Sequence, residues 1–165
     1  MNDADSLLIT RGKSFRRSIV IHPTGCSYKV ISADAHTKHG ANLHGILFDE
    51  LHAQPNRELY DVLKTSTGAR RQPLEIYMTT AGFDRQSVCY EVYEYACKVR
   101  DELIEDEAFM PVIFEASLED DWTKEETWKK ANPNYDISIF KGYFEKEVRE
   151  AKAKPTYENT FKRLQ

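Results

Sequence analysis

The sequence predicts an α/β fold in which a largely parallel sheet has flanking helices and an antiparallel hairpin beside it. Short β-rich or apolar runs alternate with stretches of helical periodicity from residue 44 onward, which is typical of strand–helix–strand units. Two β-rich runs near the start flank a Pro-Thr-Gly turn. Apolar residues make up 41% and charged residues 30% of the 165 positions, a balance that favours a globular chain with a core over disorder.

The first two elements are a hairpin and a buried strand. The runs at 18–22 and 28–32 are β-rich and predict the two arms of the hairpin. Residues 44–48 then contain consecutive apolar side chains, which favours a strand covered on both faces, as in a parallel sheet. This strand ends at two adjacent acids, Asp49 and Glu50.

A helix and a second strand follow. Pro55 suits the first turn of a helix that ends near Gly68 and has Leu59, Val62 and Leu63 on one face. Apolar and other residues alternate over 73–80, which predicts a strand that breaks at Ala81 and Gly82. A polar motif again follows the end of a strand.

The next helix and strand extend the alternation. Asp84 is expected to cap a long helix. Its apolar stripe, expected to pack into the core, contains Val88, Val92, Tyr95, Val99 and Leu103. Residues 110–117 are expected to form a further strand.

Two helices are expected in the last third of the chain. Thr123 and Glu126 have the spacing of a capping box for a short helix that ends at Asn132-Pro133. Residues 138–155 form an amphipathic pattern with Phe140, Phe144 and Val148 four residues apart.

Charge and composition limit the classes of function. The formal net charge of −4 gives no overall attraction to nucleic acid, so DNA contact needs a local patch. A basic cluster near the start either is a solvated arm or contacts DNA; it contains Arg11, Lys13, Arg16 and Arg17. No apolar run is long enough to span a bilayer, and three cysteines form no paired framework, so a cytoplasmic protein without membrane contact is expected.

The sharpest chemical signal is the pair Asp49–Glu50 at the end of an apolar strand. Ligand sites of open α/β folds lie at the carboxyl edge of the sheet. In P-loop ATPases one acid at this place holds magnesium, directly or through water, and the next polarises the attacking water. Asp49 is the expected metal-side acid and Glu50 the expected base; alternatively, the two acids only open a loop.

Thr79, Thr80, Ala81 and Gly82 form the second signal, at the end of the next predicted strand. Small hydroxyl residues and a glycine allow the backbone to approach a phosphate or respond to its loss. The alternative is an ordinary turn from a strand into a loop.

Three stretches carry a resemblance to a known family: SADAHTKHGANLHGILFDELHAQPNRELYDVL, GARRQPLEIYMTTAGFDRQSVCYEV and EDDWTKEETWKKANPNY. They resemble the large terminase subunits of tailed phages, and the likeness extends from about Ser18 to the end of the chain. The resemblance implies an incomplete P-loop NTPase fold of the ASCE type. It also implies a motor that uses ATP and Mg²⁺ to pump DNA into a procapsid.

The resemblance assigns roles to individual residues. Asp49 and Glu50 match the Walker B pair of the family, with Asp49 the magnesium-side residue, and Thr79, Thr80, Ala81 and Gly82 match its coupling motif. Lys38 either lies near the nucleotide of a neighbouring subunit or is a solvated loop lysine. The implied partners are double-stranded phage DNA, the small terminase subunit, the portal protein and further copies of the subunit in a ring.

The chain departs from the family pattern at its phosphate-binding half. The one Walker A candidate is Gly12-Lys13-Ser14, and Leu7 occupies the position of the first glycine. We therefore expect residues 1–154 to be a partial ATPase domain and residues 155–165 to begin a linker towards an absent nuclease domain. Such a fragment is expected to be inactive alone and to expose the apolar strand at Ile46–Phe48.

Three further interpretations stay open at this point. Asp49-Glu50-Leu51-His52 has the form of the acidic motif of DExH helicases. The histidines at 36, 39, 44 and 52 suggest a metal site, although their spacing matches no known finger. The chain is alternatively a catalytically inactive prophage remnant or an interaction module.

Overall fold

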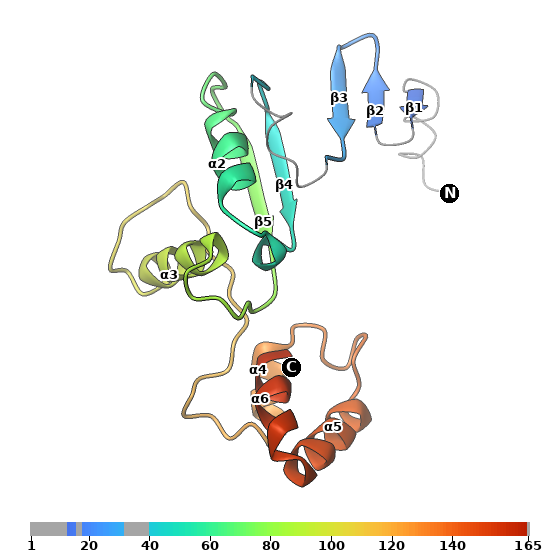
Figure 1. Cartoon of the computed structure of the whole chain (residues 1–165), viewed down its shortest axis with the longest axis vertical. Helices are drawn as coiled ribbons and strands as arrows, with labels where there is room; N and C mark the ends of the chain where they lie inside the picture. Colours follow the sequence, from blue (N-terminus) through green and yellow to red (C-terminus); the bar gives the residue numbers. More distant parts are fainter. Residues whose placement is uncertain (1–12, 16–17, 32–39, 165) are drawn as a thin grey trace. The chain divides into compact units, whose positions relative to one another are not determined.

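The computed structural model describes residues 13–15, 18–31 and 40–164, with the side chains of 13–15 and 164 left out (Figure 1). The chain divides into two compact units. One contains the described residues up to Ile46 together with Arg57–Leu74, and the other contains Leu47–Asn56 and the residues from Glu75 onward. Each unit is described by itself below.

Most strands and helices follow one another in the order that the sequence predicts. The strands are β1 (Lys13–Phe15), β2 (Ser18–Ile21), β3 (Cys26–Lys29), β4 (Gly45–Asp49) and β5 (Leu74–Met78). The helices are the 3₁₀-helix η1 (Leu51–Ala53), α2 (Glu58–Thr65), α3 (Val88–Arg100), α4 (Glu125–Ala131), α5 (Lys141–Ala153) and α6 (Pro155–Leu164).

The predicted hairpin is confirmed, and a third strand extends it. β2 and β3 pair antiparallel, and Gly25 in their turn has a φ of 68°, which glycine adopts without strain. β1 pairs antiparallel with β2 on the other side. Lys13 and Ser14 therefore lie in a strand, whereas a phosphate-binding lysine and serine follow a loop and begin a helix.

β4 and β5 form a separate two-stranded sheet, and they run parallel. The backbone N–H of Leu74 donates to the carbonyl of His44 at 3.0 Å, next to the start of both strands. Further along both strands the rings of Phe48 and Tyr77 lie 6.1 Å apart. The contacts advance in the same direction on both strands, so the prediction of a parallel sheet is confirmed.

The expectation that β4 is covered on both faces is wrong. Ile46 and Phe48 are each 5% exposed, but Leu47 between them is 56% exposed. Successive side chains of a strand point to opposite faces, so only one face of β4 is covered in the described structure. Of the three apolar residues expected to be exposed, only Leu47 is.

The uncovered face of this sheet continues from β4 onto β5. Tyr77 contacts Phe48, so its neighbours Ile76 and Met78 lie on the opposite face, with Leu47. Ile76 is 38% and Met78 45% exposed. Leu47, Ile76 and Met78 are called the exposed sheet face below.

Two predicted helices begin later than expected. α2 begins at Glu58 rather than at Pro55, and Leu59 and Leu63 are buried as predicted. α3 is capped by Ser87, whose Oγ accepts a hydrogen bond from the N–H of Tyr90 at 3.3 Å. The prediction that Asp84 caps α3 is therefore wrong.

The prediction of a strand at 110–117 is also wrong. These residues form neither a helix nor a strand, and no β-ladder connects them to the described part of the chain. Glu115 fastens them to α3, since its carboxylate accepts hydrogen bonds from Arg100 Nη1 at 2.7 Å and from the Tyr93 hydroxyl at 2.5 Å.

The last three helices share an aromatic core. Phe144 is fully buried, and its ring stacks on that of Trp128 with centroids 5.3 Å apart. Phe161 of α6 is 3% exposed in the same cluster, so residues 155–164, expected to begin a linker, form a packed helix. The predicted capping box is absent: the N–H of Thr123 donates to Asp121, and no side chain caps α4.

Among the described helices, none is long and apolar enough to cross a membrane.

Candidate functional site

The two predicted acids stand where β4 ends and η1 begins. Asp49 is the last residue of β4 and is exposed. Glu50 follows in a left-handed conformation, with φ 55° and ψ 49°, and is the N-cap residue of η1. A non-glycine residue held there costs on the order of 1–3 kcal/mol, and such strain clusters at functional sites.

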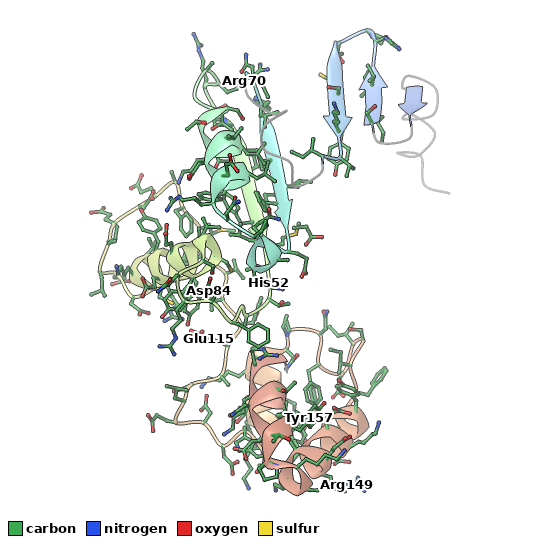
Figure 2. All side chains as sticks on the ribbon, viewed as in Figure 1. His52, Arg70, Asp84, Glu115, Arg149 and Tyr157 are labelled. Atoms are coloured by element: carbon green, nitrogen blue, oxygen red, sulfur yellow. The ribbon has the colours of Figure 1, made fainter. Side chains whose placement is uncertain are left out.

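His52 lies against the side chain of Glu50. Its Nε2 is 3.4 Å from a carboxylate oxygen of Glu50, and the imidazole is 24% exposed. The turn of η1 brings this pair together, because Glu50 and His52 are only two residues apart. Figure 2 labels His52 at this turn, just beyond β4.

The other side of His52 contacts Thr79 and Thr80, directly after β5. The backbone N–H of His52 donates to Thr79 Oγ1 at 3.1 Å, and its ring Nδ1 lies 3.0 Å from the same oxygen. Thr80 Oγ1 is 3.5 Å from Nδ1. The two predicted motifs therefore meet at one imidazole ring, although 27 residues separate His52 from Thr79.

Gly82 approaches His52 from the same loop. A Cβ added at Gly82 would lie 3.1 Å from the Cβ of His52. That distance is tighter than ordinary packing, so the absence of a side chain permits the approach. Ala81 lies between Thr80 and Gly82 and is exposed.

The loop after β5 also contacts the last helix. The guanidinium carbon of Arg163 in α6 lies 3.4 Å from the centre of the Phe83 ring. This is a cation–π contact at close range. The loop after β5 is thus joined to η1 through His52 and to α6 through Phe83.

A magnesium ion implied by the family fits the acid at the end of β4. Asp49 offers an exposed carboxylate, the type of ligand that Mg²⁺ prefers. In the described part of the chain no cluster of three or more metal-binding side chains is found. This suits Mg²⁺, which is commonly held by one or two carboxylates together with water and substrate phosphates.

Most of the other predicted residues lie outside the described part of the chain. Lys38, His36 and His39 lie outside the described residues, and so do Arg11, Arg16 and Arg17 of the basic cluster. His44 precedes β4, at the opposite end of the strand from Asp49. The four-histidine metal site is therefore not supported.

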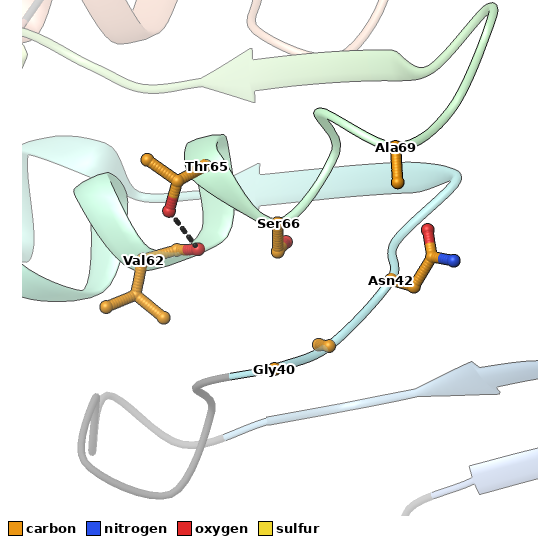
Figure 3. A pocket seen from close by; sticks show the side chains of 7 residues that line it. Gly40, Asn42, Val62, Thr65, Ser66 and Ala69 are labelled. Carbon is orange, nitrogen blue, oxygen red and sulfur yellow. Dashed lines mark hydrogen bonds between the residues drawn. The ribbon is translucent and has the colours of Figure 1, made fainter.

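A shallow cavity of about 310 Å³ lies between the segment before β4 and the end of α2 (Figure 3). Small or uncharged residues line it: Gly40, Ala41, Asn42, Val62, Thr65, Ser66 and Ala69. Arg70 holds the loop before β4 through two hydrogen bonds to the carbonyl of Asn42, at 2.8 and 3.3 Å. The cavity contains no predicted catalytic side chain.

Sequence reasoning missed the role of His52 as the contact between the two motifs. It also missed Ser87 as the cap of α3 and Arg163 as the partner of Phe83. A histidine two residues after an acidic pair was visible, but nothing in the sequence pairs it with Thr79. That contact depends on β4 and β5 being adjacent, parallel strands.

The fold and the site define the class of protein domain. It is an α/β domain with acids and hydroxyls at the carboxyl ends of neighbouring parallel strands. Residues 4–98 match the model of the terminase large subunit, ATPase domain. The chain therefore belongs to the terminase large subunit family. This confirms the resemblance and does not favour the helicase, remnant or interaction-module interpretations.

Individual relatives agree with the family match. Over 123 residues the chain is 30% identical to protein YmfN of Escherichia coli K12, covering 74% of this chain and 27% of that protein. Over 144 residues it is 27% identical to the terminase large subunit of Enterobacteria phage HK97, covering 86% of this chain and 28% of that protein. The chain thus spans little more than a quarter of these relatives.

The crystal structure of the HK97 bacteriophage large terminase has the same fold. The TM-score is 0.79 with 23% sequence identity, over 98% of this chain and 34% of that structure.

Proposed function

We propose that this chain supplies the acid-bearing part of the ATP-hydrolysing site of a motor that packages phage DNA. The main observation behind the proposal is that the His52 ring contacts both Glu50 and Thr79. Two motifs with the residue types needed for hydrolysis and coupling then stand at neighbouring strand ends. The family match supports nucleotide use in general terms.

Asp49 and Glu50 have separate tasks in this proposal. Asp49 would hold Mg²⁺, directly or through water, and the ion would neutralise charge developing on the transferred phosphate. Glu50 would accept a hydrogen bond from the attacking water and orient it. Because the Glu50 side chain is 58% exposed, water has access to it.

Binding of the triphosphate needs groups that the described residues do not include. Lys13 and Ser14 lie in β1, so no phosphate-binding loop is found in the described part of the chain. The partial ATPase domain at 1–154, the linker beginning at 155, the ASCE type of the fold and inactivity of the isolated chain remain proposals. So do double-stranded DNA, the small terminase subunit, the portal protein and a ring of subunits as partners.

Lys38 keeps its two interpretations, as a contact to a neighbouring subunit's nucleotide or as a solvated lysine. A bacterial cytoplasm is the proposed location.

A paramagnetic metal tests the proposal directly. Mn²⁺ replaces Mg²⁺ at oxygen sites and broadens the NMR signals of nearby amides. We expect Mn²⁺, added to the chain without ATP, to broaden the amides of 49–51 and 79–82 before others. Asp49→Asn should abolish this selective broadening, because the metal-side carboxylate is gone.

The matched control is Glu107→Gln, which removes an exposed loop carboxylate away from the strand ends. It should leave the broadening unchanged. Equal broadening in the Asp49→Asn variant, or broadening centred elsewhere, would contradict the assignment of Asp49.

A further inference from the structure

We propose that His52 is a positioning residue through which the side chain of Glu50 and the hydroxyl of Thr79 change position together. The inference rests on the proposed function of Glu50 as the base. It goes beyond that function by naming the group that connects the two motifs. It stands on the contacts of one imidazole ring with three side chains.

Each of the two ring nitrogens of His52 lies close to a side-chain oxygen of another residue. Nε2 faces the Glu50 carboxylate at 3.4 Å, and Nδ1 faces Thr79 Oγ1 at 3.0 Å. In a neutral imidazole one nitrogen donates and the other accepts. With the proton on Nε2, the ring presents a donor to the Glu50 carboxylate, and Nδ1 competes for the Thr79 hydroxyl with the carbonyl of Thr80, to which that hydroxyl donates at 3.1 Å.

The rigidity of the ring turns these contacts into a coupling. The two nitrogens of an imidazole are fixed relative to each other, so the ring cannot follow a moving carboxylate without moving Nδ1. When the ring follows Glu50 towards a bound water, Nδ1 leaves Thr79 Oγ1 or Thr79 moves with it. Conversely, a shift of Thr79 pulls the ring away from Glu50.

The surroundings leave the ring few other positions. The backbone N–H of His52 is tied to Thr79 Oγ1 at 3.1 Å, and Gly82 lies against the Cβ of His52. Thr79 Oγ1 also lies 3.6 Å from the Sγ of Cys89, which is buried in α3. A change in the position of Glu50 can therefore be transmitted through contacting side chains to the loop after β5 and to α3.

The geometry also explains the strained backbone of Glu50. A left-handed residue at this place turns the chain sharply into η1, and the following turn brings His52 back beside the carboxylate. An extended residue at 50 would carry the chain on along the strand direction. The contact between Glu50 and His52 therefore depends on the φ of 55° at Glu50.

The test uses amide NMR spectra of the whole chain without metal or nucleotide. Glu50→Gln keeps the size of the side chain and removes its charge. In the otherwise wild-type chain we expect this substitution to shift the amide signals of Thr79 and Thr80. Glu107→Gln, the matched control, should not shift them.

Two variants at position 52 separate the contacts. Asn places an amide where Nδ1 lies and keeps the reach to Thr79, whereas Gln places an amide near Nε2 and keeps the reach to Glu50. In the His52→Asn background we expect Thr79 and Thr80 to stay close to their wild-type signals. Their response to Glu50→Gln should nevertheless be lost, and it should be lost in the His52→Gln background as well.

Two results would overturn the proposal. One is an undiminished response of Thr79 to Glu50→Gln in both position-52 backgrounds, which would assign the coupling to the backbone. The other is the absence of any response in the chain with His52 intact. Because no metal or ATP is present, failure of the Mn²⁺ experiment and failure of this one are distinguishable.

Discussion

At the scale of the residue, the site depends on contacts between individual side chains that a sequence pattern does not reveal. Asp49 and Glu50 were predicted because an apolar strand that delivers two acids to a sheet edge is a recognisable pattern. Thr79, Thr80 and Gly82 were predicted as a motif, but not as the binding surface for an imidazole. His52 was considered only as a helicase-motif or metal-binding residue, since its partner lies far away in the sequence.

Gly82 provides a prediction at this scale. In Gly82→Ala the new methyl group lies 3.1 Å from the Cβ of His52, an atom close to the backbone that has little room to move. We expect the free energy of unfolding to fall by about 1–3 kcal/mol, the usual cost of overpacking. Urea unfolding measures this change.

Gly142→Ala is the control for Gly82→Ala. A Cβ at Gly142 would meet no atom within 4 Å, and the residue lies in the first turn of α5. Its stability should stay equal or rise slightly, since alanine is the better helix former. Equal losses in the two variants would refute a specific clash with His52.

At the scale of the element, periodicity predicted which segments are helices, and side-chain hydrogen bonds decided where they begin. α3 and α5 were predicted from stripes of apolar residues, and both exist. Two members of the stripes are exceptions: Leu103 lies beyond the end of α3 and is 75% exposed, and Phe140 precedes α5 and is 62% exposed. Ser87 rather than Asp84 caps α3 because its hydroxyl reaches the N–H of Tyr90. Several residues near a helix start are able to cap it, so the spacing of residue types alone does not choose among them.

A pH prediction belongs to the contact between α4 and α5. The pKa of Glu125 is lowered from 4.5 to about 2, first by its hydrogen bond with Lys129 in α4 and then by that with Lys141 in α5. A carboxyl group with a lowered pKa stabilises the folded state above its unfolded pKa. It loses that contribution as the pH falls towards the folded value.

We therefore expect the wild-type chain to lose part of its stability between about pH 4.5 and pH 2. Glu125→Gln should be less stable at neutral pH and show a flatter decline over this window. Thermal unfolding followed by circular dichroism at several pH values measures both. A decline as steep in Glu125→Gln as in Glu119→Gln, an exposed loop variant, would exclude Glu125 as the source.

At the scale of the whole molecule, the sequence predicted the order of the strands and helices better than it predicted which of their faces are buried. The parallel pair, the hairpin, α4 and α5 were expected, whereas α6 was not. Residues 110–117 were expected as a strand because their pattern is that of a strand. A ladder needs two strands, and the described chain supplies no partner for this one.

The exposed sheet face provides a prediction at this scale. Apolar patches that a protein leaves uncovered promote association. We expect the isolated chain to self-associate and Leu47→Lys to reduce the association, because a charge on this face resists burial. Sedimentation velocity over a range of concentrations measures the change.

Leu118→Lys is the control for the sheet face. Leu118 is fully exposed, with a relative accessibility of 102%, but lies in a loop rather than on the β4–β5 sheet. Its replacement should leave association nearly unchanged. Equal effects of the two lysines would point to general hydrophobicity rather than to this face.

The contact between Phe83 and Arg163 has a mechanical consequence. A hydrogen bond fixes both distance and angle, whereas a cation over an aromatic ring is attracted to the whole face of the ring. The Arg163 guanidinium therefore keeps its attraction while it turns in the plane of the Phe83 ring. The contact therefore tolerates rotation of the Arg163 side chain while α6 stays packed in its aromatic core.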